Sequence, residues 1–389
     1  MRSISTAERR ARLGLRHRLA ADGRTDDPVA VARSLTALHA TDPATVFLQV
    51  AARSRTAEPT HVEQALYDDR TLLRLLAMRR TMFVVPTDFL PALQAAVGDQ
   101  LAVKQRRAYG KHMAGAGLGD GDLDGWLRDV EESTHRALLE LGAATGAQLS
   151  AAEPRLRSKV VLAPGKSYST TTGITTWVLV TLGCEGRIVR GRPNGSWVSS
   201  QYVWSPIETW LPGGVPSMPV DEARAEVVRR YLRTFGPATA VDVKWWTGWT
   251  AGEVRKALAG LDTAETDAGL VLADDLEPVP APEPWAALLP ALDATPMGWK
   301  ERDFYLAPGH VPALFDRNGN IGPTVWWDGR IVGGWGQDAG GEVVFRFLED
   351  AGSDAEAAVA AEAERMSAFL GGVRITPRFR TPLERELAS

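Results

Sequence analysis

Apolar and polar residues recur with helical spacing through much of the first sixty positions of the chain. Apolar side chains alternate with arginines from the sixth residue onward, which indicates an amphipathic helix. Asp27-Pro28 and Asp42-Pro43 each place an N-cap aspartate before a proline at the first helical position, a pattern typical of helix starts. These signals predict helices over 6–20, 28–38 and 43–53.

A change of pattern follows at 78–86, MRRTMFVVP, where β-favouring residues run up to a proline and predict a strand. Short helices followed by β-structure form the plan of a winged helix, a variant of the helix-turn-helix. The plan recurs: helical patterns cover 122–141 and 170–183, and two strands then meet around Pro193-Asn194-Gly195, a strong hairpin signal. A third copy opens with the helix DEARAEVVRRYLRTFG, which Gly236 closes.

A proline-rich linker at 276–284 precedes a change of texture. Strand patterns with glycine turns cover 323–335 and 341–350 and predict a small β-barrel or sheet, with a final helix near 354–370. We therefore predict an α+β protein with three tandem winged helices and a C-terminal β-barrel. The expected domains are 1–118, which carries the candidate catalytic motif, 119–216 with a hairpin wing, 217–275, and 285–389.

Composition removes several classes of function. The single cysteine, Cys184, excludes an internal disulfide and offers no metal cluster, and the sequence holds no GxGxxG, P-loop, HExxH or CxxC motif. We expect no metal and no nucleotide cofactor. No apolar run approaches the ~18 residues that would indicate a membrane span, and the N-terminal segment lacks a signal-peptide core. A cytoplasmic protein is the expectation.

The charge distribution bears on nucleic acid. A net charge of −4 argues mildly against it, but the charges are segregated. Acidic residues gather in 120–132, 262–283 and 349–364. Basic residues gather in the first helix (Arg2, Arg9, Arg10, Arg12, Arg16, Arg18) and in a second cluster (Lys104, Arg106, Arg107, Lys111). A one-sided DNA-binding face is possible, although arginine-rich helices can also be no more than solvated faces.

Five stretches, spread in order over nearly the whole chain, carry a resemblance to a known family. They are ALHATDPATV (37–46), MRRTMFVVP (78–86), YLRTFGPATAVDVKWWTG (231–248), PMGWKERDFYL (296–306) and NGNIGPTVWWDGRIVGGW (318–335). The chain resembles the AlkZ-like and YcaQ-like winged-helix DNA glycosylases. The resemblance implies a C-shaped protein around duplex DNA that hydrolyses the N-glycosidic bond of N7-alkylated purines, in some members bulky adducts of genotoxic natural products.

The sequence departs from that family at its catalytic motif. Where the family has Gln-hydrophobic-Gln or Gln-hydrophobic-Asp, this chain has His39-Ala40-Thr41, followed by Asp42. A carboxylate or a neutral histidine can activate water and stabilise oxocarbenium-like charge. We expect Asp42 to raise the basicity of His39 and Thr41 to orient water. Asp42 is also a good N-cap, and Thr41 and His39 could each be structural only.

The candidate DNA-binding residues are basic. We expect Arg79 and Arg80 on the strand at 78–86, the cluster residues and the predicted wing to contact phosphates, with Lys244 in the third unit. The full set is Arg79, Arg80, Lys104, Arg106, Arg107, Arg190, Arg192 and Lys244. Most tryptophans are expected to pack in cores. Asp293 and Arg302 are expected to form a buried structural pair.

The leading hypothesis is a monofunctional DNA glycosylase that removes N7-alkylated guanine from double-stranded DNA, in base excision repair or self-resistance to a genotoxin. We expect a nucleoid-associated monomer. The chief alternative is a non-enzymatic winged-helix DNA-binding protein or transcription regulator, which the net charge of −4 and the absent glutamines favour. A third hypothesis, a structural adaptor that binds protein through the barrel, predicts no salt-dependent DNA binding.

Overall fold

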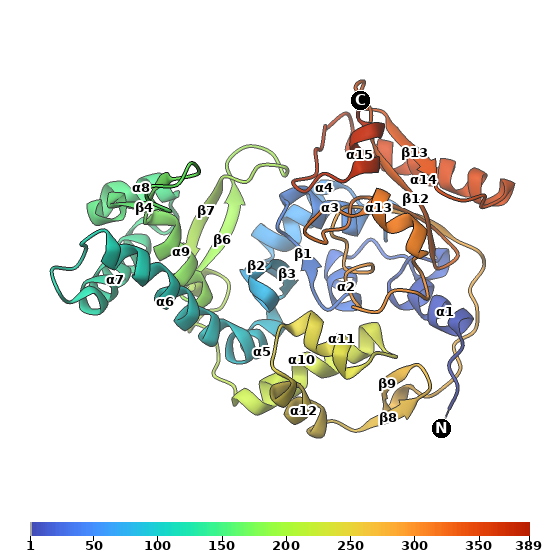
Figure 1. Ribbon diagram of the computed structural model, residues 1–389, viewed down its shortest axis with the longest axis horizontal. Helices are drawn as coiled ribbons and strands as arrows, with labels where there is room; N and C mark the ends of the chain where they lie inside the picture. Colours follow the sequence, from blue (N-terminus) through green and yellow to red (C-terminus); the bar gives the residue numbers. More distant parts are fainter. Residues whose placement is uncertain (1) are drawn as a thin grey trace.

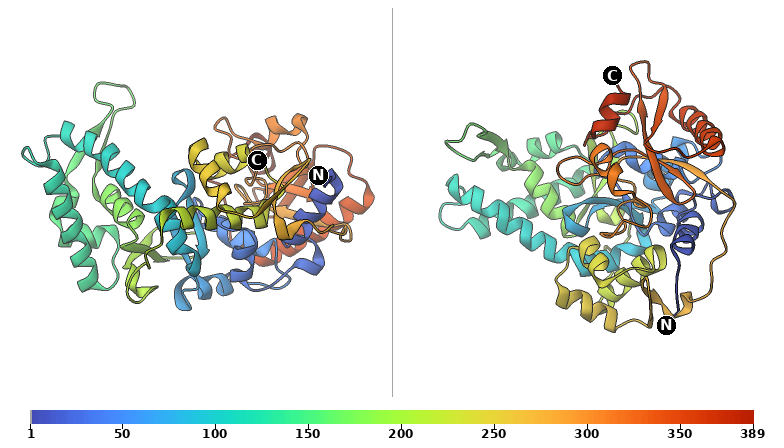
Figure 2. Two further views of the ribbon diagram at one scale, coloured as in Figure 1. Left: turned by 90° about the horizontal axis from the view of Figure 1, so that it is seen from below. Right: turned by 45° about the vertical axis from the view of Figure 1, so that its right-hand side comes forward.

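The computed structural model describes residues 2–389. The segment from α7 to β7 projects to one side of a larger body that the rest of the chain builds, with α6 running between the two (Figure 1). Figure 2 shows the same separation from two further directions, with the projecting segment in teal and green. Within residues 2–389 no helix is long and apolar enough to cross a membrane.

The first segment combines short helices with a three-stranded antiparallel sheet in the order β1-β3-β2. The predicted helices over 6–20 and 28–38 end earlier than expected, because Arg18 (φ 57°) and Thr36 (φ 63°) adopt the left-handed conformation that stops a helix. The strands are β1 (Leu38–His39), β2 (Leu72–Leu76) and β3 (Met82–Pro86). The helices are α1 (Thr6–Arg16), α2 (Pro28–Ser34), α3 (Pro43–Ala51), α4 (Pro59–Glu63), α5 (Leu90–Leu93) and α6 (Asp99–Gly115).

The predicted strand over 78–86 is correct only from Met82 onward. Residues Met78–Arg80 form a helical turn between β2 and β3, in which Arg79 (φ 53°) and Arg80 (φ 59°) have left-handed backbones. Both arginines therefore lie at the tip of a hairpin and not within a strand.

The second segment has its own hydrophobic core, formed around Leu127, Val130, Leu149 and Leu182. The helix predicted over 170–183 is wrong in its first part, where three consecutive threonines favour a strand. The helices are α7 (Leu123–Leu141), α8 (Gly146–Ala152) and α9 (Thr175–Cys184). The strands form two hairpins, β4 (Lys159–Leu162) with β5 (Thr170–Gly173), and β6 (Ile188–Pro193) with β7 (Tyr202–Pro206).

The third segment repeats the combination of helices and a hairpin. Gly236 ends its first helix as predicted, and capping boxes at Thr239 and Thr250 begin the next two. Its elements are α10 (Val220–Phe235), α11 (Ala240–Thr247), α12 (Ala251–Ala259), β8 (Thr263–Thr266) and β9 (Gly269–Leu272). The division into three winged helices stays a prediction, because the helices and strands of each segment do not by themselves identify it as a winged-helix domain.

The C-terminal segment forms an open four-stranded antiparallel sheet in the order β10-β11-β12-β13. The predicted barrel is not formed among the described residues: β10 and β13 are edge strands, and four strands are too few to close. The final helix is present. The elements are β10 (Ala286–Leu289), β11 (Thr324–Trp327), β12 (Arg330–Gln337), β13 (Val343–Phe347), α13 (Val311–Leu314), α14 (Ser353–Leu370) and α15 (Pro382–Leu387).

All four predicted domains contribute buried side chains to one hydrophobic core, the second of them through Val189, Ile207 and Trp210. Leu13 from α1, Leu93 from α5, Phe235 from α10 and Trp299 from the C-terminal segment belong to a single cluster of buried side chains. The predicted boundaries at 118, 216 and 275 therefore divide the sequence but do not divide this packed body.

A fully buried ion pair joins α3 to the C-terminal segment. Arg53 and Asp293 have side chains that are 0% exposed and meet through two hydrogen bonds of 2.8 and 2.7 Å. Arg53 also donates to Thr295 Oγ1 and to the carbonyl oxygens of Gln49 and His17. The predicted pairing of Asp293 with Arg302 is wrong, because Arg53 occupies both carboxylate oxygens.

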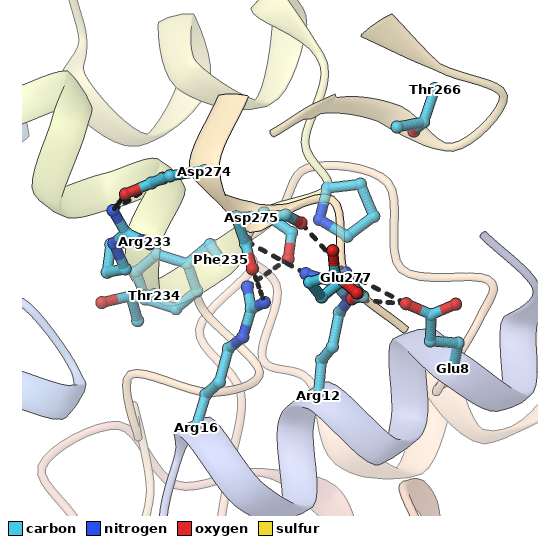
Figure 3. A network of polar contacts seen from close by, with 12 residues as sticks. Glu8, Arg12, Arg16, Arg233, Thr234, Phe235, Thr266, Asp274, Asp275 and Glu277 are labelled. Carbon is cyan, nitrogen blue, oxygen red and sulfur yellow. Dashed lines mark hydrogen bonds and ion pairs between the residues drawn. The ribbon is translucent and has the colours of Figure 1, made fainter. Parts of the chain in front are cut away.

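The arginines of α1 are also used internally. Arg12 and Arg16 both bind the carboxylate of Asp275, and Arg12 also binds Glu8 (Figure 3). Arg2, which precedes α1, binds Glu8 as well. The network fixes α1 against the chain that follows β9. These side chains are therefore neither a free DNA-binding face nor a merely solvated one.

The loop between β6 and β7 is docked on the large body. Trp197, 9% exposed, lies with its ring centre 4.9 Å from that of Phe47 on α3 and 6.1 Å from that of Phe369 on α14. This aromatic contact holds the tip of the hairpin. The predicted wing thus bridges the second segment and the body, because Trp197 in its loop is buried against α3 and α14.

Replacing Asp293 by Asn tests the buried ion pair. We expect the free energy of unfolding to fall by about 3–5 kcal/mol, because Arg53 would keep an uncompensated charge in the core. Urea denaturation at neutral pH measures it. Lys256→Gln removes the exposed pair with Asp221 and should change the stability by less than about 1 kcal/mol. Equal, small effects of both variants would contradict this role for the buried pair.

Candidate functional site

The motif found in the sequence lies where β1 turns into α3. His39 ends β1, paired with Phe83 of β3, and the amide of Ala40 donates to the carbonyl of Met82. Asp42 caps α3, since its Oδ1 accepts a hydrogen bond from the amide of Ala44 at 3.1 Å. The predicted capping role of Asp42 is confirmed, and the turn is fixed from both sides.

His39 is a buried and neutral histidine. Its side chain lies edge-on to Phe83, with ring centres 5.7 Å apart, and Gln49 Nε2 holds its carbonyl oxygen at 2.9 Å. Burial, together with the nearby charge of Arg79, lowers the pKa of His39 to about 3. The amide of Thr41 lies 3.5 Å from His39 Nδ1, at the long limit of a hydrogen bond.

The expected support of His39 by Asp42 is wrong. No hydrogen bond or ion pair in residues 2–389 joins the two side chains, and the charge that acts on the imidazole is that of Arg79. The strand explains the separation: His39 shares a sheet face with Phe83, whereas Asp42 lies beyond the end of β1. The two groups have different surroundings and different chemistry.

Asp42 has a carboxylate surrounded by donors but without a salt bridge. Its Oδ2 accepts a hydrogen bond from the backbone amide of Arg378 at 3.2 Å. Burial raises the pKa of Asp42, while the amides of Arg378 and Ala44 and the charges of Arg378 and Arg74 oppose the rise. Among the described residues, no arginine side chain forms an ion pair with it.

Arg74 and Tyr202 lie near Asp42, and Arg190 lies beside Tyr202. The guanidinium of Arg74 lies 4.8 Å from the ring centre of Tyr202 and donates to the carbonyl of Ala40 at 3.0 Å. Arg190, half-buried on β6, lies 5.2 Å from the same ring and 5.2 Å from that of Trp204. Sequence reasoning missed Arg74 and Tyr202. The available signal was the arginine inside the apolar strand LLRLL, because arginine is rarely buried unless it is paired or has a functional role.

A second arginine stack lies on the His39 side of the turn. Arg79 lies 4.2 Å from the ring centre of Trp245 on α11, and Arg302 lies 5.1 Å from it. Arg80 donates to Tyr109 Oη at 2.9 Å. Arg79, Arg80 and Lys104 line a hollow of about 270 Å³ between α6 and α11. The hairpin tip thus brings two predicted DNA-binding residues to one basic hollow.

The remaining predicted DNA-binding residues divide into free and paired groups. Lys104, Arg107 and Lys244 are exposed. Arg106 is engaged by Glu131 and Glu185, and Arg192 by Glu63 and Asp68. Arg106 and Arg192 are therefore poor candidates for phosphate contacts, because carboxylates already neutralise their charges. The sequence did not reveal these pairs, because the acidic partners are distant in sequence and close only in the fold.

No group of three or more histidine, cysteine, aspartate or glutamate side chains suited to a metal ion occurs in the part of the chain that the structure describes. Cys184 is buried, and burial raises its thiol pKa to about 12, which leaves it unreactive.

One family model matches most of the chain. The family model for DNA glycosylase AlkZ-like proteins matches residues 32–369. No curated protein matches the sequence. Among solved structures, the chain is similar to Streptomyces sahachiroi DNA glycosylase AlkZ, with a TM-score of 0.73 and 21% identity, over 97% of this chain and 100% of that one.

At that identity the structural likeness shows a shared fold, and the family model adds membership because it spans most of the sequence. The chain belongs to the AlkZ-like family of DNA glycosylases.

Proposed function

We propose that the chain is a monofunctional glycosylase that hydrolyses the N-glycosidic bond of N7-alkylated guanine in double-stranded DNA. The observation that carries the proposal is the carboxylate of Asp42, which caps α3 among arginines without forming an ion pair with any of them in the described structure. Family membership supports the reaction class. The proposed partner is duplex DNA, bound by a monomer.

The chemistry needs a carboxylate more than it needs an acid. N7-alkylation makes the guanine cationic, so the base leaves as a neutral species and takes the electron pair of the bond between C1′ and N9. The sugar becomes oxocarbenium-like, and a carboxylate stabilises that charge. A water then forms the new bond to C1′ and passes its proton to Asp42.

The directions of the two pKa shifts favour Asp42 over His39 as the proton acceptor. His39 is a weak base, because its pKa is about 3, whereas burial raises the pKa of the Asp42 carboxyl above its ordinary value. The better acceptor is the group with the higher pKa. We assign water activation to Asp42 and orientation of the water to the hydroxyl of Thr41, while His39 supports the turn as a buried, neutral residue.

Exposed basic side chains bind the DNA backbone in the proposed complex. Lys104, Arg107 and Lys244 are solvent-exposed, and Arg79 and Arg80 line the adjacent hollow. We propose that these side chains hold backbone phosphates, which carry no sequence information. Preference for a bulky adduct over 7-methylguanine would indicate self-resistance to a genotoxin, and the opposite preference would indicate general base excision repair.

The second candidate is a DNA-binding protein without catalysis, such as a regulator. The observation that favours it is the pair His39 and Thr41, which stand where related glycosylases have glutamine or a carboxylate. It predicts duplex binding without base release.

Asp42→Asn tests the proposal. Asparagine caps helices as well as aspartate, so the fold should persist while the charge is lost. We expect release of 7-methylguanine and of a bulky N7-guanine adduct to slow by at least ~10²-fold, with duplex affinity retained. Chromatography of released base measures it. Release by the variant at the wild-type rate excludes Asp42, and no release by wild type despite tight binding supports the regulator.

The raised pKa of Asp42 predicts an acid limb in the rate. The carboxylate must be ionised, so activity is retained above this pKa and lost as the pH falls through it. We expect the midpoint of the loss to lie above the ordinary value of 3.8. Single-turnover rates, corrected for uncatalysed depurination, measure it. A midpoint at or below the ordinary value would contradict the burial of the carboxyl.

The depressed pKa of His39 predicts a change of stability with pH. The unfolded chain binds a proton below about 6.5 and the folded chain only near 3, so stability is lost as the pH falls between these values. His17 behaves likewise. Near pH 5, His39→Gln should reduce the slope of unfolding free energy against pH by about 1.4 kcal/mol per unit. Urea titrations measure it, with the exposed His61→Gln as the control. An unchanged slope in His39→Gln would mean that His39 is already protonated near pH 5 in the folded protein, which would contradict the depressed pKa.

A further inference from the structure

Tyr202 lies between two guanidinium groups that have no carboxylate partner. Arg74 and Arg190 lie 4.8 and 5.2 Å from its ring centre, and neither forms an ion pair within residues 2–389. Arg74 is 2% exposed, and its Nε is buried without a hydrogen-bond partner. The hydroxyl of Tyr202 is also buried and unpaired. Three polar side chains thus meet with unused donors.

The arrangement is electrostatically unfavourable as it stands. Burial and the charges of Arg74 and Arg378 lower the pKa of Arg190, since like charges are held together. Buried donors without acceptors and buried cations without anions each cost free energy. The nearby carboxylate of Asp42 accepts backbone amides and forms no ion pair here. An anion from outside the chain would satisfy the unused donors.

A cleft leads to Arg190 and Tyr202, and the buried guanidinium of Arg74 lies over the ring of Tyr202. Arg190, Tyr202 and Trp204 line a cleft of about 510 Å³ bounded by the first residues of α8 and α9. Its lining includes hydroxyl and amide side chains, such as Thr175, Asn194 and Ser200, and it contains no acidic residue. Although the chain has more acidic than basic residues, the lining of this cleft carries no negative charge. Such a lining is complementary to a phosphodiester backbone.

We propose that Arg74, Arg190 and Tyr202 form a phosphate-binding site that seats one phosphodiester of the DNA backbone at the inner end of this cleft, beside Asp42. The inference rests on the proposed function and adds a defined contact to it. Arg74 connects the site to the motif, because it also binds the carbonyl of Ala40. A phosphate bound here would set the position of the neighbouring sugar relative to the Asp42 carboxylate.

The same hairpin supplies a matched pair of variants. Arg190→Gln removes a cation of the site, while Arg192→Gln removes a cation that Glu63 and Asp68 already neutralise. Affinity for an undamaged duplex is measured against salt concentration. We expect Arg190→Gln to reduce the slope of log affinity against log salt by about one, and Arg192→Gln to leave it unchanged. Equal slopes in wild type and Arg190→Gln would overturn the proposal.

Tyr202→Phe tests the hydroxyl without removing the ring. Because this hydroxyl has no partner in the free protein, its loss should not lower the melting temperature. Duplex affinity should fall by about tenfold, the effect of losing one hydrogen bond to a charged group. An unchanged affinity would remove Tyr202 from the site.

Replacing single phosphates by neutral methylphosphonates locates the contact. In wild type, replacement of the phosphate that occupies the site should weaken duplex binding. In Arg190→Gln, replacement of that same phosphate should cause no further loss of affinity, whereas replacement of the other contacted phosphates should weaken binding as it does in wild type. Identical scans for both proteins would overturn the assignment. Inorganic phosphate that binds wild type but not Arg190→Gln, with equal duplex affinities, would indicate a free-anion site instead. Absence of salt-dependent duplex binding in wild type would contradict the proposed function itself.

Discussion

The buried pair of Arg53 and Asp293 is the constraint on which the site depends. Two charges at 0% exposure must remain together, so the end of α3 is tied to the segment that follows β10. Gln49, one turn earlier, links His39 to Ala294, and Thr45 donates to the carbonyl of Ala291. The helix is fixed along its length to one stretch of the C-terminal segment. Asp42, at its N-terminus, is therefore held in place from the far end of the chain.

Around this fixed helix, two groups of arginines lie over aromatic rings near the motif. The guanidinium groups of Arg79 and Arg302 lie over the ring of Trp245, and Arg79 is near His39. Those of Arg74 and Arg190 lie over the ring of Tyr202, which is near Asp42. Many other basic side chains are neutralised by carboxylates, as Arg12, Arg16 and Arg106 show. Positive charge is thus concentrated near the motif although the net charge is −4.

Local signals predicted the local structure well. The aspartate before Pro43 marks the start of α3, and the pattern of the third segment gave its helices, because caps and periodicity act over a few residues. The sequence could not show that Arg192 meets Glu63, or that Trp197 reaches Phe47, because these contacts join distant segments. The expected effect of Asp42 on His39 failed for the opposite reason: neighbours in sequence lie in different surroundings once β1 ends.

In the proposed reaction, the Asp42 carboxylate stabilises positive charge on the sugar. The most direct measurement of this role is the affinity for a duplex that carries a cationic 1-aza-deoxyribose, compared with the neutral tetrahydrofuran analogue, in wild type and in Asp42→Asn. We predict that wild type prefers the cationic sugar by at least ~10-fold, as expected of a transition-state analogue, and that the variant loses this preference. An equal preference in both proteins would contradict this role of Asp42.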